Sequence, residues 1–315
     1  MLDEVVLVVL WRAYSLSSYL LIYHDTFIYV EDALCRVKER VTLTIDRDIL
    51  RIVDDRIDGT HVKNRSHAVE LLLRQSLKAG APTTAVILAG GKGTRLKPLT
   101  DKVPKSLVEL GGKPILQHNI ELCKRYGITN IVLSVGYMAD QIREFCGDGS
   151  KFGVSITYIE EKEPLGTAGA LKLLKGKLTE TFILMNGDEL KDINLDKMHQ
   201  AHMESNAKAT IALTTVEDPS SYGVALMDGQ RIVRFVEKPK KEDAPSKLIS
   251  AGLYILEPEV IALVPDGFAM IEFDVFPKLA KDGKLYGYPF SGQWFDTGTM
   301  ERFQRAAKEW KGFSS

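Results

Sequence analysis

One stretch of the chain organises the rest, and it reads Ala85-Val86-Ile87-Leu88-Ala89-Gly90-Gly91-Lys92-Gly93-Thr94-Arg95. The apolar residues 86–88 favour a buried strand, and three glycines within the next five positions favour a loop against which a ligand backbone can lie. Such a loop leaves backbone N–H groups free to face an anion. Residues 92–105 also carry five lysines or arginines and one aspartate. We therefore expect a phosphorylated ligand at the carboxyl end of this strand.

The glycine spacing excludes two common phosphate-binding loops. Walker A requires Lys-Ser or Lys-Thr after its last glycine, whereas Gly93 precedes Thr94-Arg95, and no G-x-G-x-x-G fingerprint is present here. The stretch, with Pro104-Lys105 after it, instead resembles the G-G-x-G-T-R-L-x-P-L-T…P-K signature of the sugar-1-phosphate nucleotidyltransferases, or nucleotide-sugar pyrophosphorylases. The resemblance covers about residues 84–311 and implies transfer of a nucleotidyl group from an NTP to a sugar 1-phosphate, with release of pyrophosphate and with Mg²⁺ as cofactor.

Composition places few limits on the chain beyond an ordinary globular class. It has 315 residues, a net charge of −1 and three cysteines without a C-x-x-C pair. This charge predicts no general affinity for polyanions, and the cysteine pattern predicts a reduced, cytoplasmic protein without structural disulfides or zinc. We expect three parts: an N-terminal extension over 1–36, a small module over 37–80, and a large domain over 82–315.

Residues 1–36 are apolar and rich in β-branched and aromatic side chains. They begin with acidic rather than basic residues and lack a cleavage site, so a secretory signal is not expected. A membrane span over 5–23 would be short and would contain Arg12. We therefore favour a poorly ordered extension, with a membrane-tethered enzyme as the alternative.

The module over 37–80 combines one strand pattern with two helix patterns. Residues 40–45 alternate, with Val41, Leu43 and Ile45 on the opposite face from Arg40, Thr42 and Thr44. Helices are expected over about 47–57, capped by Asp46, and over about 65–78, capped by Asn64. This pattern resembles the ribbon-helix-helix family of DNA-binding proteins. The resemblance implies a homodimer that pairs its strands, with DNA-binding residues Arg40, Thr42 and Thr44.

Charge leaves two hypotheses for this module. Residues 36–80 carry ten basic and seven acidic side chains, a net of +3, which is modest for a DNA-binding unit. The two hypotheses are that the module binds DNA as a dimer and that it only dimerises. The segment from Gly80 to Thr84 is expected to be a linker.

From residue 84 onward, apolar strand patterns alternate with helical ones. Strands are expected over 85–88, 130–135, 154–159 and 181–185, with helices over about 115–126, 138–146 and 167–174. The alternation predicts an α/β fold with a doubly wound, mostly parallel, Rossmann-like sheet and a site at the strand carboxyl ends. Runs at 224–227, 232–236 and 248–255 predict an antiparallel excursion that could cover the sugar side of the cleft.

The family resemblance assigns roles to residues in separated motifs. It implies that Arg95 and Lys105 act on the triphosphate as the catalytic cations. It implies a nucleotide site formed by Leu88, Ala89, Gly90, Gly91, Gly93, Thr94, Glu161, Pro164, Gly166 and Thr167. It also implies a sugar-phosphate site formed by Tyr222, Gly223, Glu237, Lys238, Ala251, Gly252 and Glu272. Ser250 stands where the family pattern more often has Asn, which puts the local hydrogen bonding in doubt.

Two aspartates in separate motifs are the metal candidates. Asp188 follows an apolar strand in Asn186-Gly187-Asp188, and Asp296 lies in Trp294-Phe295-Asp296. Magnesium prefers one or two carboxylates together with phosphate oxygens. In the family these two positions hold the metal. His199 and His202, three apart on an expected helix, are interpreted as a solvated face rather than a metal site.

Glu161 bears on the choice of base. Within the superfamily this position tends to be Gln in uridylyl and thymidylyl enzymes and acidic in guanylyl ones, and guanine presents two donors to an acceptor-only carboxylate. The chain is therefore most like the mannose-1-phosphate guanylyltransferases, and GDP-mannose or a related GDP-sugar is the expected product. A UDP- or dTDP-glucose-forming enzyme is one alternative; a DNA-binding regulator that senses nucleotide sugars is another.

Overall fold

The computed structural model describes residues 18–23, 26–31, 42–60, 62–76 and 80–314. The chain divides into two compact units, residues 1–52 and 53–315. Among the described residues, no helix is both long and apolar enough to cross a membrane.

The first unit contains a hairpin that was not predicted. Strand β1 (Ser18–Tyr23) pairs antiparallel with β2 (Thr26–Glu31), so that Ser18 faces Glu31 and Tyr23 faces Thr26. The strand predicted over 40–45 is not found in its described part, because residues 42–46 have no strand structure. The physical reason is that a ladder needs a partner strand, and the predicted partner belongs to a second chain. Arg40 lies outside the described residues, and Thr42 and Thr44 lie in this unpaired segment.

Two helices follow, as predicted, with the predicted caps. Helix α1 (Arg47–Asp54) begins after Asp46, whose Oδ1 accepts the Asp48 N–H at 2.8 Å. Helix α2 (Arg65–Ser76) begins after Asn64, whose Oδ1 accepts the His67 N–H at 3.0 Å. Helix α1 ends three residues before the predicted residue 57, and the predicted end of α2 near residue 78 lies outside the described residues. The guanidinium of Arg65 pairs with Asp54 at 2.6 Å and so joins the start of α2 to the end of α1.

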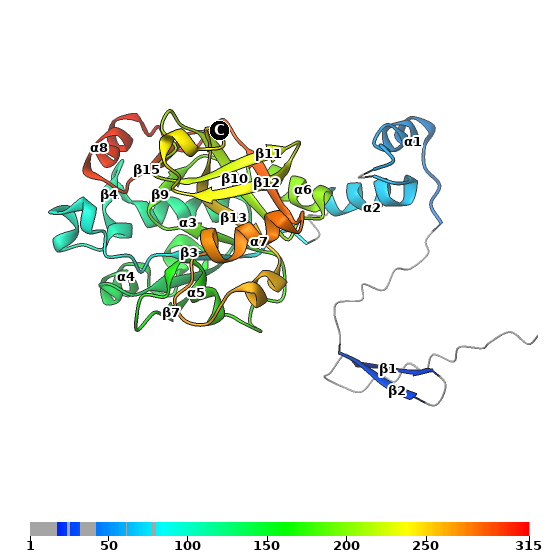
Figure 1. Cartoon of the computed structure of the whole chain (residues 1–315), viewed down its shortest axis with the longest axis horizontal. Coiled ribbons are helices and arrows are strands. Elements are labelled where there is room, and N and C mark those ends of the chain that lie inside the picture. Colours follow the sequence, from blue (N-terminus) through cyan, green and yellow to red (C-terminus); the bar gives the residue numbers. More distant parts are fainter. Residues whose placement is uncertain (1–17, 24–25, 32–41, 61, 77–79, 315) are drawn as a thin grey trace, which may run out of the picture. The chain divides into compact units, whose positions relative to one another are not determined.

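The second unit is built on a nine-stranded sheet with the order β10-β14-β12-β11-β13-β8-β3-β6-β7. Figure 1 labels several of these strands, among them β3 and β10 to β13, together with the helices around them. The parallel half comprises β8 (Phe182–Asn186), β3 (Thr84–Leu88), β6 (Asn130–Val135) and β7 (Ser155–Glu160). The other half comprises β10 (Ala209–Thr215), β11 (Gly223–Asp228), β12 (Arg231–Glu237), β13 (Leu248–Leu256) and β14 (Leu285–Pro289).

This sheet is mixed, and the prediction of a mostly parallel sheet was wrong. The second half is mainly antiparallel: β13 pairs antiparallel with β8, β10 and β11, and β12 pairs antiparallel with β11 and β14. Strands β11 and β12 are joined by a tight turn at Gly229 (φ +59°), and a short connection of this kind allows only antiparallel pairing. Strand β10 pairs in parallel with β14.

Helices cover both faces of the sheet, which is the doubly wound arrangement. Alternate residues of β3 enter different cores: Val86 packs with α5 (Gly166–Lys172) and α7 (Phe276–Lys281), while Ala85 and Ile87 pack with the other set of helices. That set comprises α3 (Ile115–Arg125), α4 (Ala139–Cys146) and α6 (Leu195–Ser205). A strand buried on both faces must be apolar throughout, which explains the continuous apolar run in the sequence.

A smaller, two-stranded ribbon places the C-terminal region beside the carboxyl end of β8. Strand β9 (Glu189–Lys191) pairs antiparallel with β15 (Trp294–Asp296), and α8 (Met300–Glu309) follows. The ribbon is held by a third hydrophobic core, formed by Val108, Leu110, Ile115, Leu190, Phe295 and Ala306. Leu110 belongs to the short strand β4 (Glu109–Leu110), which pairs with β5 (Lys113–Pro114). The ribbon fixes where Asp296 lies relative to Asp188.

The interpretation of His199 and His202 as a solvated face was wrong. Both are buried on α6, and the ring of His202 contacts the Thr210 hydroxyl at 2.7 Å and the Glu257 carboxylate at 3.2 Å. Burial lowers the pKa of His199 to about 4. The His202 ring is therefore packed against β10 and the segment after β13.

Candidate active site

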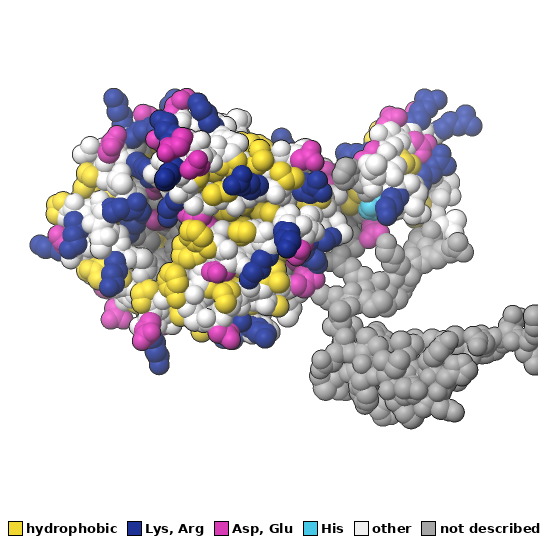
Figure 2. All heavy atoms as spheres, in the orientation of Figure 1, with side chains coloured by type: hydrophobic (Ala, Val, Ile, Leu, Met, Phe, Trp, Pro, Cys, Tyr) yellow, Lys and Arg dark blue, Asp and Glu magenta, His cyan; other side chains and the backbone are white. Residues whose placement is uncertain are grey.

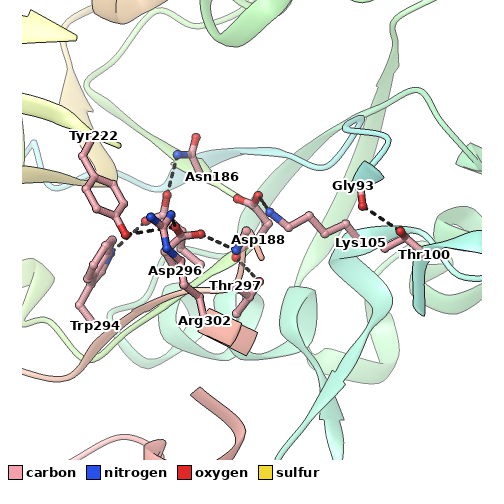
Figure 3. Close-up of polar contacts among 12 residues, drawn as sticks. Gly93, Thr100, Lys105, Asn186, Asp188, Tyr222, Trp294, Asp296, Thr297 and Arg302 are labelled. Atoms are coloured by element: carbon pink, nitrogen blue, oxygen red, sulfur yellow. Dashed lines mark hydrogen bonds and ion pairs between the residues drawn. The ribbon is translucent and has the colours of Figure 1, made fainter. Parts of the chain in front are cut away.

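The glycine loop after β3 forms one wall of the site. Gly93 has φ +61°, and a Cβ there would lie 2.9 Å from the Lys105 Cβ, so only glycine allows this close approach. The Gly93 carbonyl accepts the Thr100 hydroxyl at 2.8 Å (Figure 3). The loop is thereby folded onto the segment that carries Lys105.

A cleft of about 850 Å³ opens at the carboxyl ends of β3, β6 and β8. Its volume suits a nucleotide-sized ligand. Eight of the ten residues predicted to bind nucleotide line it, namely Leu88, Ala89, Gly90, Gly91, Glu161, Pro164, Gly166 and Thr167. Gly93 and Thr94 are not among its lining residues; Thr94 begins a short 3₁₀ turn (Thr94–Leu96) that carries Arg95.

Asp188 is brought to this cleft by a close approach of two strands. A Cβ at Gly187 would lie 2.6 Å from the Leu88 carbonyl oxygen, so glycine allows the end of β8 to touch the end of β3. The Lys105 ammonium forms an ion pair with Asp188 (Figure 3). Although burial opposes ionisation, the Lys105 charge lowers the pKa of Asp188 below its usual value. The carboxylate is therefore held charged.

Asp296 lies across the site from Lys105, with its own cation. Its Oδ2 accepts Arg302 Nη1 at 2.5 Å and the Tyr222 hydroxyl at 3.3 Å, and its Oδ1 accepts the Gly298 N–H at 2.5 Å. The Arg302 guanidinium also lies over the Tyr222 ring, 4.9 Å from its centre (Figure 3). Burial and the Asp296 charge raise the pKa of Tyr222 above its usual value, so this phenol stays neutral.

A second cavity of about 180 Å³ adjoins the cleft and shares Lys105, Thr167, Asn186, Asp188 and Met270 with it. Arg95, Asp296 and six of the seven predicted sugar-phosphate residues line it: Tyr222, Gly223, Glu237, Lys238, Gly252 and Glu272. The seventh, Ala251, is fully buried behind the cavity. The structure thus brings together two polar spaces that meet at Lys105 and Asp188.

Three glutamates face this second cavity in different surroundings. Glu237 is paired with the Lys238 ammonium at 3.2 Å, and Lys238 itself adopts φ +46°. Glu272 is buried, accepts the Thr167 hydroxyl at 2.5 Å, and has its pKa raised by burial. Burial, with Asp188 and Asp296 nearby, raises the pKa of Glu189 to about 7.

Glu161 lies in the cleft wall with both oxygens already engaged. Ser134 donates its hydroxyl to Oε1 at 2.5 Å, and the Leu165 N–H donates to Oε2 at 3.0 Å. A carboxylate oxygen has two acceptor positions. Each oxygen therefore retains one position for a ligand donor, and the carboxylate is fixed in orientation.

The two aspartates fit a magnesium ion by donor chemistry. Both line the 180 Å³ cavity and offer the carboxylate oxygens that magnesium prefers, and each is paired with one cation of the protein, Lys105 or Arg302. Among the described residues, no group of three or more His, Cys, Asp or Glu side chains is arranged to hold a metal. Phosphate oxygens of a substrate would have to complete the coordination.

Sequence reasoning missed Arg302, Glu189 and Asn186. Arg302 could have been found from the helix signal, because Thr299 caps α8 by accepting the Arg302 N–H at 3.3 Å and so places that residue at the first turn. Glu189 directly follows Asp188 but lies outside the motif. Asn186 was quoted only as part of that motif, yet its amide donates to Glu189 at 2.9 Å.

The fold and these paired spaces define an α/β nucleotide-binding domain with a second, carboxylate-lined pocket beside the nucleotide cleft. The profile of the Nucleotidyl transferase family matches residues 84–311, and the chain belongs to this family. The match includes both cavities and leaves the first 83 residues outside.

Curated relatives and solved structures agree with this family. The chain is 41% identical over 225 residues to the mannose-1-phosphate guanylyltransferase catalytic subunit beta of Danio rerio, covering 70% of this chain and 62% of that protein. It is 42% identical over 228 residues to the mannose-1-phosphate guanyltransferase of Kluyveromyces lactis, covering 69% of this chain and 62% of that protein. The chain thus spans about three fifths of the length of these relatives.

Two crystal structures are similar at 30% identity. A putative glucose-1-phosphate thymidylyltransferase from Bacillus anthracis, in complex with a sucrose, gives a TM-score of 0.67 and covers 71% of this chain and 94% of that one. HddC from Yersinia pseudotuberculosis, complexed with GMP-PN, gives a TM-score of 0.62 and covers 72% of this chain and 99% of that one.

Proposed function

We propose that residues 84–311 transfer a nucleotidyl group from GTP to mannose 1-phosphate or a closely related sugar 1-phosphate, forming a GDP-sugar and pyrophosphate. The observation that carries this proposal is the junction of the two cavities at Lys105 and Asp188. A nucleotide in the larger cleft and a sugar phosphate in the smaller one would meet there. The mannose-1-phosphate guanylyltransferases among the curated relatives support the choice of base and sugar.

The reaction requires positioning and charge neutralisation rather than a protein nucleophile. The sugar phosphate oxygen attacks the α-phosphorus in line, and pyrophosphate leaves. Lys105 and Arg95 line the space where the two anions meet and neutralise charge as it develops. Asp188 and Asp296 would hold Mg²⁺, which would supply positive charge to neutralise the substrate phosphates during the transfer.

The direct test is a panel of nucleoside triphosphates and sugar 1-phosphates, read by pyrophosphate release. GTP with mannose 1-phosphate is expected to give the highest kcat/KM. A preference for UTP or dTTP would leave only the general reaction, and no turnover with any pair would favour the alternative of a catalytically silent nucleotide-sugar sensor.

Changing Glu161 to Gln should weaken the preference for GTP. The Leu165 N–H can only donate, so the glutamine carbonyl must face it and the amide group must face Ser134, whose hydroxyl can also accept. One of the two acceptor oxygens is thereby replaced by a donor. A mispaired polar contact of this kind costs about tenfold to a hundredfold in specificity.

The readout for this change is kcat/KM for GTP, UTP and dTTP. Glu163→Gln is the matched control, because Glu163 is an exposed carboxylate in the same loop that does not line the cleft. Equal effects of the two substitutions on all three nucleotides would show that Glu161 does not read the base.

The N-terminal module is proposed to dimerise through residues 37–80. Its described part exposes four large apolar side chains by about half, namely Leu43, Ile49, Ile52 and Leu73. The segment from residue 42 to 46 is also unpaired, and a partner chain could satisfy both features. Both charge signs are interspersed on the face shown in Figure 2. Because residues 36–80 carry a net charge of only +3, DNA binding would depend on Arg40, Thr42 and Thr44 rather than on a general basic surface.

Deleting residues 1–81 should convert a dimer into a monomer that retains catalysis, because the family match begins at residue 84. Light scattering gives the oligomeric state, and pyrophosphate release gives the activity. A monomeric full-length chain would refute the ribbon-helix-helix hypothesis. If the chain is a dimer that does not bind DNA at low salt, where electrostatic contacts are strongest, the module serves only for dimerisation.

If the dimer does bind DNA, the double substitution Arg40→Ala with Thr42→Ala should weaken DNA binding and leave the dimer intact.

A further inference from the structure

Glu189 is the one glutamate of the 180 Å³ cavity to which neither the resemblance nor the comparisons give a role. It is the first residue of β9, directly after Asp188, and its partner across the ribbon is Asp296. Asn186 Nδ2 donates to its Oε1 at 2.9 Å, and Trp294 Nε1 donates to its Oε2 at 3.0 Å. Two neutral donors from separate segments thus hold the carboxylate in one orientation.

The backbone at Gly252 is packed against this carboxylate. Gly252 has φ +58°, and a Cβ there would lie 2.4 Å from Glu189 Oε1, so only glycine leaves room for the side chain. Lys191, which is fully buried, donates to the Gly252 carbonyl at 3.3 Å, and Ser250 accepts the Gly252 N–H at 3.2 Å. Residues 189 and 191 point to the same face of β9, and both side chains lie against the Gly252 backbone.

The arrangement leaves acceptor capacity facing the cavity. Each carboxylate oxygen has two acceptor positions and uses one of them for Asn186 or Trp294. Burial disfavours the charge of this carboxylate, and the buried Lys191 ammonium offsets part of that cost. The group that would use the remaining acceptor capacity must be a donor, and the donors on a sugar ring are its hydroxyl groups.

A third metal ligand is the competing role for Glu189, because it adjoins both candidate metal ligands. Within the described part of the chain, however, no three His, Cys, Asp or Glu side chains converge as a metal site. The geometry therefore favours a sugar contact over a metal contact.

We propose that Glu189 accepts a hydrogen bond from one hydroxyl group of the sugar ring and so selects which sugar 1-phosphate is used. This inference rests on the proposed function. Glu237 and Glu272, on other walls of the same cavity, would read other hydroxyls. A sugar without that hydroxyl leaves the remaining acceptor position of the Glu189 carboxylate without a donor.

The test combines substitutions at Glu189 with a set of monodeoxy analogues of the preferred sugar 1-phosphate. In the unaltered protein, the analogue that lacks the contacted hydroxyl should lose about 10- to 100-fold in kcat/KM, as expected for a hydrogen bond to a charged group. In Glu189→Ala, that one analogue should lose no more than about threefold relative to the parent sugar. The other analogues should keep their original penalties, and Glu189→Gln should fall between.

Three outcomes are distinguishable. If every analogue keeps the same penalty in Glu189→Ala as in the unaltered protein, Glu189 does not contact the sugar and the inference is wrong. If the magnesium concentration for half-maximal rate rises instead, Glu189 is a metal ligand, which also overturns it. If the unaltered protein turns over no sugar 1-phosphate, the proposed function itself fails.

Two variants separate sugar recognition from a structural role. Glu259→Gln is the matched control: Glu259 pairs with Lys208 at 2.8 Å and lies outside the cavity lining, so its penalties should equal those of the unaltered protein. If Glu189→Ala does not fold, Glu189→Asp is the alternative variant, because it keeps the carboxylate but shortens the side chain by one methylene. The loss in kcat/KM for the same single analogue should still be smaller than in the unaltered protein. A uniform loss over all sugars would mark Glu189 as structural only.

Discussion

Replacing Asp188 or Asp296 by alanine should abolish magnesium-dependent pyrophosphate release. Each aspartate contributes a hard oxygen ligand to the same small cavity, and magnesium is held by few protein ligands, so losing one leaves too little to fix the ion on the substrate phosphates. We expect at least a ~100-fold fall in kcat. Excess chelator should reduce the unaltered protein to the same level.

The two substitutions should differ in their effect on stability. Asp188 is the ion-pair partner of Lys105, whose side chain is only 10% exposed, whereas Arg302 beside Asp296 is 30% exposed. Removing Asp188 leaves the more buried cation unpaired and should lower Tm more. Asp188→Asn keeps the side-chain volume and is the control for folding. A variant with unaltered magnesium dependence would remove its residue from the metal site.

The parallel half of the sheet could be predicted from the sequence almost residue by residue. The strand predicted over 130–135 is β6, and the one over 85–88 lacks only the first residue of β3. Those predicted over 154–159 and 181–185 are each shifted by one residue from β7 and β8. Strands buried on both faces appear as continuous apolar runs between helical periods, so the local pattern contains the needed information.

The antiparallel half could be predicted only in part. The runs at 224–227, 232–236 and 248–255 lie within β11, β12 and β13, but β10 and β14 were not predicted. Strand β10 pairs with β13 and β14, which follow it by more than thirty residues. Pairing between strands so far apart in the sequence depends on the complete sheet, and no local hydrophobic periodicity indicates it.

The site shows the same division between local and distant information. Motifs located Asp188 and Asp296, but the bond from Trp294 to Glu189 joins residues 105 positions apart, and it forms only because β9 pairs with β15. The burial of His202 likewise depends on Thr210 and Glu257. These contacts between distant segments therefore could not be predicted from the local helix and loop patterns.

Arg95→Ala and Lys105→Ala should each lose at least ~100-fold in kcat/KM, the scale of removing one preorganised charge from a developing anion. Both side chains line the cavity that adjoins the nucleotide cleft, and Lys105 belongs to both spaces. Lys105 also balances Asp188, so its removal leaves that carboxylate facing the substrate phosphates without compensation. The Lys105 change should therefore be the more severe of the two.

The matched control is Lys97→Ala in the same loop. Lys97 pairs with Asp101 at 3.0 Å on the surface and lines neither cavity, so its loss should change kcat/KM by less than about threefold. Arg95→Lys should recover part of the activity, because it restores the charge but not the planar fork that matches phosphate oxygens. Substitutions at Arg95 and Lys105 that lower Tm and leave kcat/KM unchanged would make these cations structural. A kcat/KM loss that Arg95→Lys does not relieve would mean that the geometry of the guanidinium, rather than its charge, carries the contribution of this residue.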